Sequence, residues 1–206
     1  MFNKFPLIIP VFPLSGVIYF PKTNLPLNVF EKYYLEMVDY SFTSDKLIGM
    51  IQTMDNGDLY KVGCFGKINS YEETLDGRYL INLIGKSYFR IFNEKKDTKS
   101  FKTVEAEVLE PDEIKKNYTV NQKTKDFLIE KYFSFINASN QHADISLLKK
   151  IDSASLIKFL AMSSPFTIAE KQMLLETYDL DKMTNKIVTL FEKKLFKEAL
   201  TEIEIF

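Results

Sequence analysis

A few short motifs contain residue types that take part in chemistry, and the first is a fragment of a phosphate-binding loop. Gly85-Lys86-Ser87 matches the end of that loop, but a leucine stands at residue 80, where the first glycine belongs. The tripeptide also lies between two strand-like runs, 78–84 and 88–92, whereas a phosphate-binding loop must lead into a helix N-terminus. We therefore interpret Gly85 as a bend between two strands and predict no nucleotide site.

Nucleophiles and metal ligands are scarce in this chain. Cys64 and His142 are its only cysteine and histidine, so nothing indicates a zinc site or a Cys–His pair. Cys64 lies among strand-forming apolar residues, where a thiol behaves as a small hydrophobic group. Ser155 and Lys158 have the S-x-x-K spacing, but on an amphipathic helix they indicate a solvated lysine beside a small residue. We predict no catalytic residue, no metal ligand and no cofactor.

Charge and composition narrow the class of partner and the location. The 206 residues include 27 Lys and Arg against 28 Asp and Glu, a balance that disfavours general binding to nucleic acid or to anionic membranes. No apolar run approaches the roughly 18 residues of a membrane span. Prolines interrupt the apolar N-terminus, which therefore lacks the core of a signal peptide. With a single cysteine, these features lead us to expect a cytoplasmic protein.

The chain has two halves of different sequence character. The first half is rich in predicted strands. Asn56-Gly57 and Asp76-Gly77 are hairpin turn signals. Asn28 and Glu31 resemble a capping box, which predicts that a helix begins within the apolar stretch 10–34. Strands are predicted at 7–12, 17–20, 47–53, 67–73, 78–84, 88–92 and 103–109. The predicted helix has one apolar stripe, formed by Phe30, Tyr33, Tyr34, Met37, Val38 and Ser41.

From about residue 120 the pattern is helical. Thr167 and Glu170 form a clear capping box, and the last helix is predicted to begin at Asp179 or Asp181. Its buried face is predicted to contain Met183, Ile187, Leu190, Phe191 and Leu195. Two domains follow from this change of pattern, a β domain at 1–115 and a helical bundle at 116–206 that ends in a long C-terminal helix.

Several blocks of sequence, in this order and spacing, resemble the N-terminal substrate-binding domain of Lon protease. The blocks are Pro10–Val17, Phe20-Pro21, Leu25-Pro26-Leu27, Val29-Phe30-Glu31, Val62-Gly63-Cys64, Asp76-Gly77-Arg78-Tyr79, Phe89-Arg90-Ile91 and Glu170-Lys171-Gln172 with Leu174-Leu175-Glu176. The chain departs from the family at Tyr33 and Tyr88, where the family usually has arginine.

The resemblance implies an α+β fold, a PUA-like, mostly antiparallel β-barrel followed by the C-terminal helical bundle. A full Lon protease continues into an ATPase and a peptidase domain, whereas this sequence ends at Phe206, so we expect a free-standing member of the family. Recognition of unfolded or apolar polypeptide segments, or of a protein partner, is then the expected function. Such a non-catalytic module could act as an adaptor for proteolysis or chaperoning.

Apolar residues at the proline breaks are the candidate peptide-binding residues, Phe20, Leu25, Leu27, Phe30 and Tyr33. The alternative is that these side chains simply close the barrel. The C-terminal helix, which is followed by Ile205 and Phe206, could mediate self-association. Two other functions stay open at this point: an RNA-binding PUA-like domain, which the charge balance disfavours, and a small-molecule enzyme with an unrecognised site.

Overall fold

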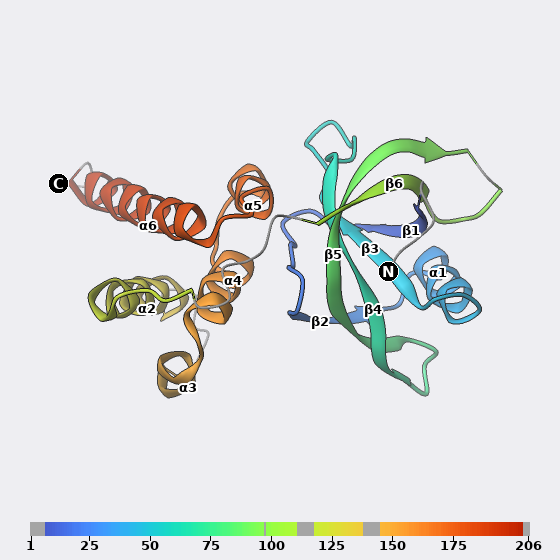
Figure 1. Ribbon diagram of the computed structural model, residues 1–206, viewed down its shortest axis with the longest axis horizontal. Coiled ribbons are helices and arrows are strands. Elements are labelled where there is room, and N and C mark those ends of the chain that lie inside the picture. The colour runs from blue at the N-terminus through green and yellow to red at the C-terminus, as the bar shows by residue number, and fades with distance from the viewer. Residues whose placement is uncertain (1–6, 97, 111–117, 138–144, 204–206) are drawn as a thin grey trace. The chain divides into compact units, whose positions relative to one another are not determined.

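The computed structural model describes residues 7–96, 98–110, 118–137 and 145–203. The chain divides into two compact units, Met1–Glu110 and Pro111–Phe206. Strands and one helix occupy the first unit, and helices occupy the second (Figure 1). The fold class is therefore α+β, as predicted.

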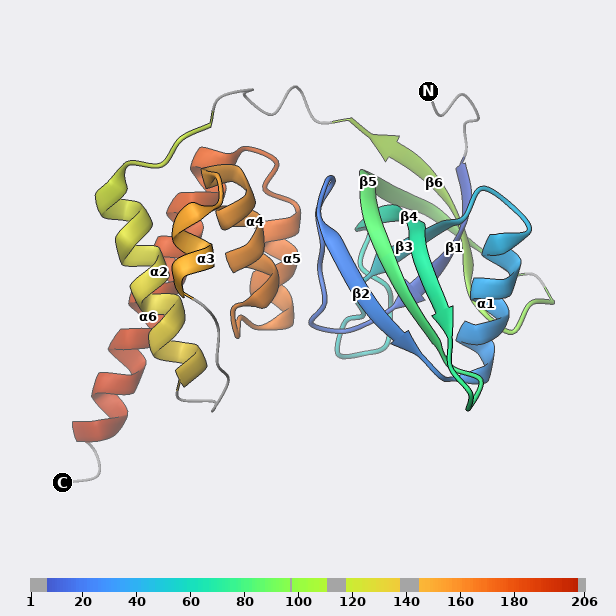
Figure 2. The same ribbon diagram turned by 90° about the horizontal axis from the view of Figure 1, so that it is seen from below.

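The first unit is a sheet that closes on itself. Its elements are β1 (Leu7–Pro13), β2 (Asn24–Val29), α1 (Lys32–Phe42), β3 (Leu47–Ile51), β4 (Val62–Glu73), β5 (Tyr79–Lys95) and β6 (Thr103–Leu109). The strand order is β2-β5-β4-β3-β1-β6, and β5 also pairs with β6, which completes the barrel (Figure 2). The pairing of β1 with β3 is parallel, and the other pairings between these strands are antiparallel. The predicted, mostly antiparallel barrel is confirmed.

Large side chains inside the barrel fit because small residues face them. Phe65 and Phe89 are fully buried, and a Cβ atom added at Gly63 would lie 2.6 Å from the Phe89 ring. In β6, Val104 and Ala106 are buried while the intervening glutamates are half-buried, as the alternation predicts. The hydrophobic core of the barrel consists of Ile9, Val11, Leu47, Ile51, Leu59, Phe65, Phe89, Ile91, Val104 and Ala106.

Two strand predictions are wrong, and both errors concern the same crossing. Residues 17–20 form no strand, because their backbone passes over β5 instead of lying beside a neighbour in the ladder. At the crossing, Lys22 N–H donates to the carbonyl of Gly85, and Gly85 N–H donates to the carbonyl of Thr23, both at 2.9 Å. Gly85 is consequently no bend between strands, since it lies inside the single 17-residue strand β5.

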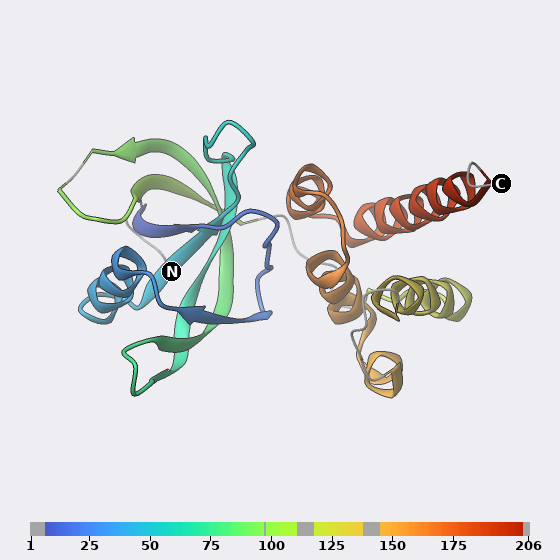
Figure 3. The same cartoon turned by 180° about the vertical axis from the view of Figure 1, so that it is seen from behind.

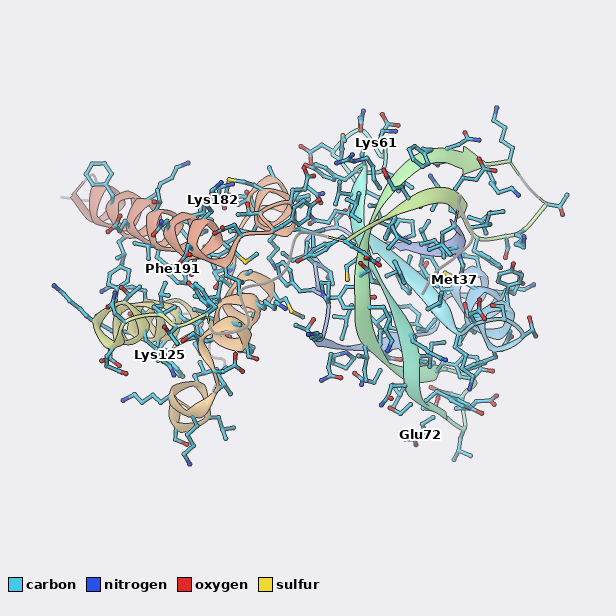
Figure 4. The ribbon with its side chains drawn as sticks, viewed as in Figure 1. Met37, Lys61, Glu72, Lys125, Lys182 and Phe191 are labelled. Carbon is cyan, nitrogen blue, oxygen red and sulfur yellow. The ribbon has the colours of Figure 1, made fainter. Side chains whose placement is uncertain are left out.

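The capping box predicted at Asn28 is also wrong. Asn28 belongs to β2, and α1 begins after Glu31, whose side chain makes no cap hydrogen bond. The stripe itself is placed correctly in its middle, where Met37 and Val38 are buried. Figure 4 labels Met37 on this helix, and α1 contacts β1 and β3.

The second unit contains α2 (Gln122–Asn137), α3 (Ile145–Lys150), α4 (Ser153–Ser163), α5 (Ile168–Leu175) and α6 (Leu180–Ile203). Helix α4 contacts α5 and α6, and α2 contacts α3 and α6 (Figure 3). The capping box of Thr167 and Glu170 is confirmed at the start of α5. Of the stripe predicted for α6, Met183, Ile187, Leu190 and Phe191 are buried and Leu195 is half-buried.

Lys158 departs from its predicted environment. Its side chain is buried on α4 and is not solvated, so the S-x-x-K interpretation was wrong on that point, while Ser155 is exposed. His142 lies outside the described residues. Among the helices that the structure describes, none combines the length and the apolar character needed to cross a membrane.

Candidate functional site

An open groove of about 520 Å³ lies on the surface formed by β2, β5 and β4. It occupies the part of the sheet near the turn that joins β4 to β5, where Figure 4 labels Glu72. Its lining residues come from three adjacent strands: Pro26, Leu27, Asn28, Ser70, Tyr71, Glu72, Leu80, Ile81 and Asn82.

The strand register explains why these residues meet. Cross-strand pairs form three rows, namely Pro26–Asn82–Ser70, Leu27–Ile81–Tyr71 and Asn28–Leu80–Glu72. Side chains alternate between the two faces of a strand, so the first and third rows share one face and the second row takes the other. Burial agrees with this assignment, because Ile81 is in the core whereas Leu80 is 41% exposed.

The lining combines amide, hydroxyl and apolar groups with a single charge. Asn28, Asn82 and Ser70 can both donate and accept hydrogen bonds, and Asn82 already donates through Nδ2 to Oδ1 of Asn24 at 3.1 Å. Glu72 is the only charged residue of the lining. Amides beside exposed apolar side chains match the two needs of an extended polypeptide, whose backbone requires hydrogen bonds and whose side chains require contact.

An aromatic cluster fixes the β4–β5 hairpin against α1 at one end of the groove. The ring centroids of Tyr71 and Phe42 are 4.5 Å apart, and those of Tyr79 and Phe42 are 5.9 Å apart. The Tyr79 hydroxyl donates to the Asp39 carboxylate at 2.9 Å. This hydrogen bond, followed by desolvation and by the charges of Asp39 and Glu73, raises the pKa of Tyr79 to about 12. The side chains of Tyr71 and Tyr79 therefore anchor the hairpin that carries Glu72 to α1.

The structure separates the five predicted binding residues. Phe20 and Leu25 are buried and lie outside the groove lining, a position that favours the alternative of closing the barrel. Leu27 is half-buried and lines the groove. Phe30, 62% exposed, and Tyr33, also exposed, lie just beyond the end of β2 and outside the lining.

Sequence reasoning missed the contribution of β4 and β5 to this surface. None of the five candidate binding residues lies on these strands, although Ser70, Glu72, Leu80 and Asn82 line the groove. A signal was available, because the Asp76-Gly77 turn sets which residues of the two strands lie opposite each other. What the turn could not predict is the third strand, β2, which comes from 50 residues earlier in the chain and supplies Leu27 and Asn28.

Metal-binding and redox chemistry find no support in the described part of the chain. There, no group of three or more His, Cys, Asp or Glu residues is placed to hold a metal ion. Cys64 is buried and forms no disulfide.

Comparison with known proteins places this chain in a family. The family model of the ATP-dependent protease La (LON) substrate-binding domain matches residues 8–193. Lon protease of Neorickettsia sennetsu is 29% identical over 202 residues, which cover 91% of this chain and 24% of that protein. Lon protease of Dictyoglomus thermophilum is 23% identical, with 92% and 25% covered. The chain therefore spans about a quarter of the length of these relatives.

Solved structures show the same fold. A Lon N-terminal domain protein from Xanthomonas campestris superimposes with a TM-score of 0.64 at 20% identity, covering 89% of this chain and 98% of that one. The N-terminal domain of the Mycobacterium avium complex Lon protease gives a TM-score of 0.61 at 16% identity, with 90% and 98% covered. On the match of the family model to most of its length, this chain belongs to the Lon substrate-binding domain family.

Proposed function

We propose that this protein is a non-catalytic module that binds unfolded or apolar polypeptide segments in the groove on β2, β5 and β4. The observation that carries the proposal is the lining itself, in which amides stand beside exposed apolar side chains. Membership of a substrate-binding family supports it, because the likeness is to that domain and not to a peptidase domain. Within the lining, Ser70 has no histidine, lysine or cysteine beside it to activate a nucleophile.

The bound segment lies extended on the sheet. Asn28 and Asn82 hydrogen-bond its backbone, which makes recognition tolerant of sequence, while Leu80 and Pro26, on the same face, contact its apolar side chains. Phe30 and Tyr33 extend the apolar surface beyond the groove for longer segments. Because such a contact is small, we expect dissociation constants in the micromolar range, as for transient interfaces.

A titration of a labelled, permanently unfolded polypeptide, followed by fluorescence anisotropy, tests the proposal. The wild-type chain should bind the unfolded form and not the same protein in its folded form. Leu80→Asn should weaken binding about five-fold, because burying roughly half a leucine side chain contributes ~1 kcal/mol. Leu75→Asn is the matched control, since Leu75 is fully exposed on the β4–β5 turn and outside the groove.

Two results would contradict the proposal. One is the absence of binding to several different unfolded polypeptides. The other is an equal loss of affinity in Leu80→Asn and Leu75→Asn, which would show that exposed apolar area matters and the groove does not.

We further propose that the protein acts in the cytoplasm as an adaptor for a protease or chaperone.

We also propose that the protein self-associates through α6. Phe196 is 67% exposed on α6, after the last buried residue described on that helix, Phe191. An apolar side chain in that position suits a helix–helix contact. Sedimentation equilibrium should show a dimer that Phe196→Asp dissociates; a wild-type chain that stays monomeric at every concentration would refute self-association.

A further inference from the structure

The groove carries one charged side chain, Glu72, in an otherwise neutral lining. Glu72 makes no hydrogen bond or ion pair with any residue in the described part of the chain. It stands directly opposite Leu80 in the pairing of β4 with β5, in the same row as Asn28. A carboxylate and an exposed leucine thus lie side by side on the face that the groove opens to.

The surroundings of Glu72 are acidic as well. Asp39 and Glu73 both lie close enough to Tyr79 to raise its pKa. Of the nearby cations, Arg78 is held by Asp76 at 2.8 Å, and Lys46 lies over the Phe42 ring at 5.8 Å. These neighbours leave a net negative potential at the Glu72 end of the groove.

Lys67 provides the nearest opposite charge along the same face of β4. It pairs with Ile84, two rows beyond the row of Asn82, and it does not line the groove. Glu72 therefore has no compensating lysine or arginine in the lining, and a cation that pairs with it must come from the ligand.

We propose that the groove selects polypeptide segments in which a lysine or arginine stands next to an apolar residue; this inference rests on the proposed polypeptide-binding function. The aliphatic stem of the ligand's basic side chain lies over Leu80 and its charged head reaches Glu72, as long basic side chains do when they cross apolar surface. The neighbouring apolar side chain contacts Pro26, which is exposed in the groove lining on the same face as Leu80. Acidic segments of equal hydrophobicity are repelled by the same carboxylates.

Three labelled peptides that differ at one position, Lys, Gln or Glu, test this selectivity on the full chain. We expect the wild type to bind the Lys peptide about two- to five-fold more tightly than the Gln peptide, the range of an exposed ion pair, and the Glu peptide least well. Added salt should reduce these ratios, because exposed charges are screened. Glu72→Gln should remove the preference for lysine while keeping the affinity for the Gln peptide, and Glu72→Lys should reverse it.

Glu105→Gln is the matched control, because Glu105 is a strand carboxylate on β6, outside the groove. It should leave the ratios unchanged. Equal binding of the three peptides to the wild type would overturn the inference and leave the proposed function intact. A lysine preference that persists in Glu72→Gln would also overturn it, by placing the cation elsewhere. Failure of every peptide to bind, including the Gln peptide, would overturn the proposed function itself.

Discussion

Replacing Gly85 by alanine should break the crossing of residues 17–23 over β5. A Cβ atom at Gly85 would lie 2.1 Å from the carbonyl oxygen of Phe20 and 3.2 Å from Cα of Pro21. Both obstacles are backbone atoms, so no side-chain rotation can relieve the overlap. Ordinary C···O contacts are about 3.3 Å, so the crossing segment must move by roughly 1 Å.

The structure resists that movement in two ways. Phe20 is fully buried in the barrel, and the two hydrogen bonds between residue 85 and residues 22 and 23 hold the segment in place. Overpacking a core costs ~1–3 kcal/mol, and each lost hydrogen bond costs about 0.5–1.5 kcal/mol. We therefore expect Gly85→Ala to lower the free energy of unfolding by about 3 kcal/mol or more.

Urea unfolding followed by near-ultraviolet circular dichroism measures this loss. The chain has no tryptophan, and eight of its eleven tyrosines lie in the first unit, so the tyrosine signal reports mainly on the barrel. Gly57→Ala is the matched control, because Gly57 has a φ of 86° with open space around it. Its cost should be limited to the left-handed backbone, about 1–2 kcal/mol.

Two results would contradict this prediction: a Gly85→Ala variant as stable as the wild type, or one at least as stable as Gly57→Ala. Either result would mean that the crossing segment accommodates a methyl group. The close approach of Phe20 would then not be the reason for glycine at this position.

Three further predictions concern a helix cap, a surface hydrogen bond and a buried hydroxyl. Thr167→Ala should lower the stability of the helical unit by about 1 kcal/mol, the usual cost of a lost N-cap, as measured by thermal unfolding. In a phenolate absorbance titration, Asp39→Asn should lower the pKa of Tyr79 from about 12 toward the ordinary value near 10. Because the folded-state pKa is the higher one, the stability contributed by this pair is complete below about pH 10 and is lost as the pH rises toward 12. Tyr19→Phe should change the free energy of unfolding by less than about 1 kcal/mol, because the removed hydroxyl is buried without a hydrogen bond of normal geometry.

Each of these predictions has an outcome that contradicts it. Unchanged thermal stability of Thr167→Ala would mean that the capping box does not stabilise α5. A Tyr79 that still titrates near 12 in Asp39→Asn would show that burial, and not the hydrogen bond, raises its pKa. Burial, and after it the adjacent Cys64 thiol, raises the pKa of Tyr19. A large loss of stability in Tyr19→Phe would reveal a further partner for the Tyr19 hydroxyl.

Local patterns in the sequence predicted the structure correctly wherever a few neighbouring residues determine the backbone conformation. The alternation of β6, the turns at Gly57 and Gly77 and the capping box of Thr167 were all read correctly. Each depends on backbone geometry or on hydrogen bonds within four residues, which the sequence order alone specifies. The family, too, could be recognised from short blocks in the right order.

Only the tertiary structure determined the path of residues 17–20 and the position of the groove, because the contacts responsible join residues far apart in the chain. Residues 17–20 have the composition of a strand, yet they cross over Gly85 some 65 residues later and therefore find no ladder partner. The groove likewise exists only because β2 pairs with β5 and β5 with β4, which brings Asn28, Leu80 and Glu72 into one row. The sequence alone could identify the Lon substrate-binding domain family, but only the register of three strands could place the candidate surface.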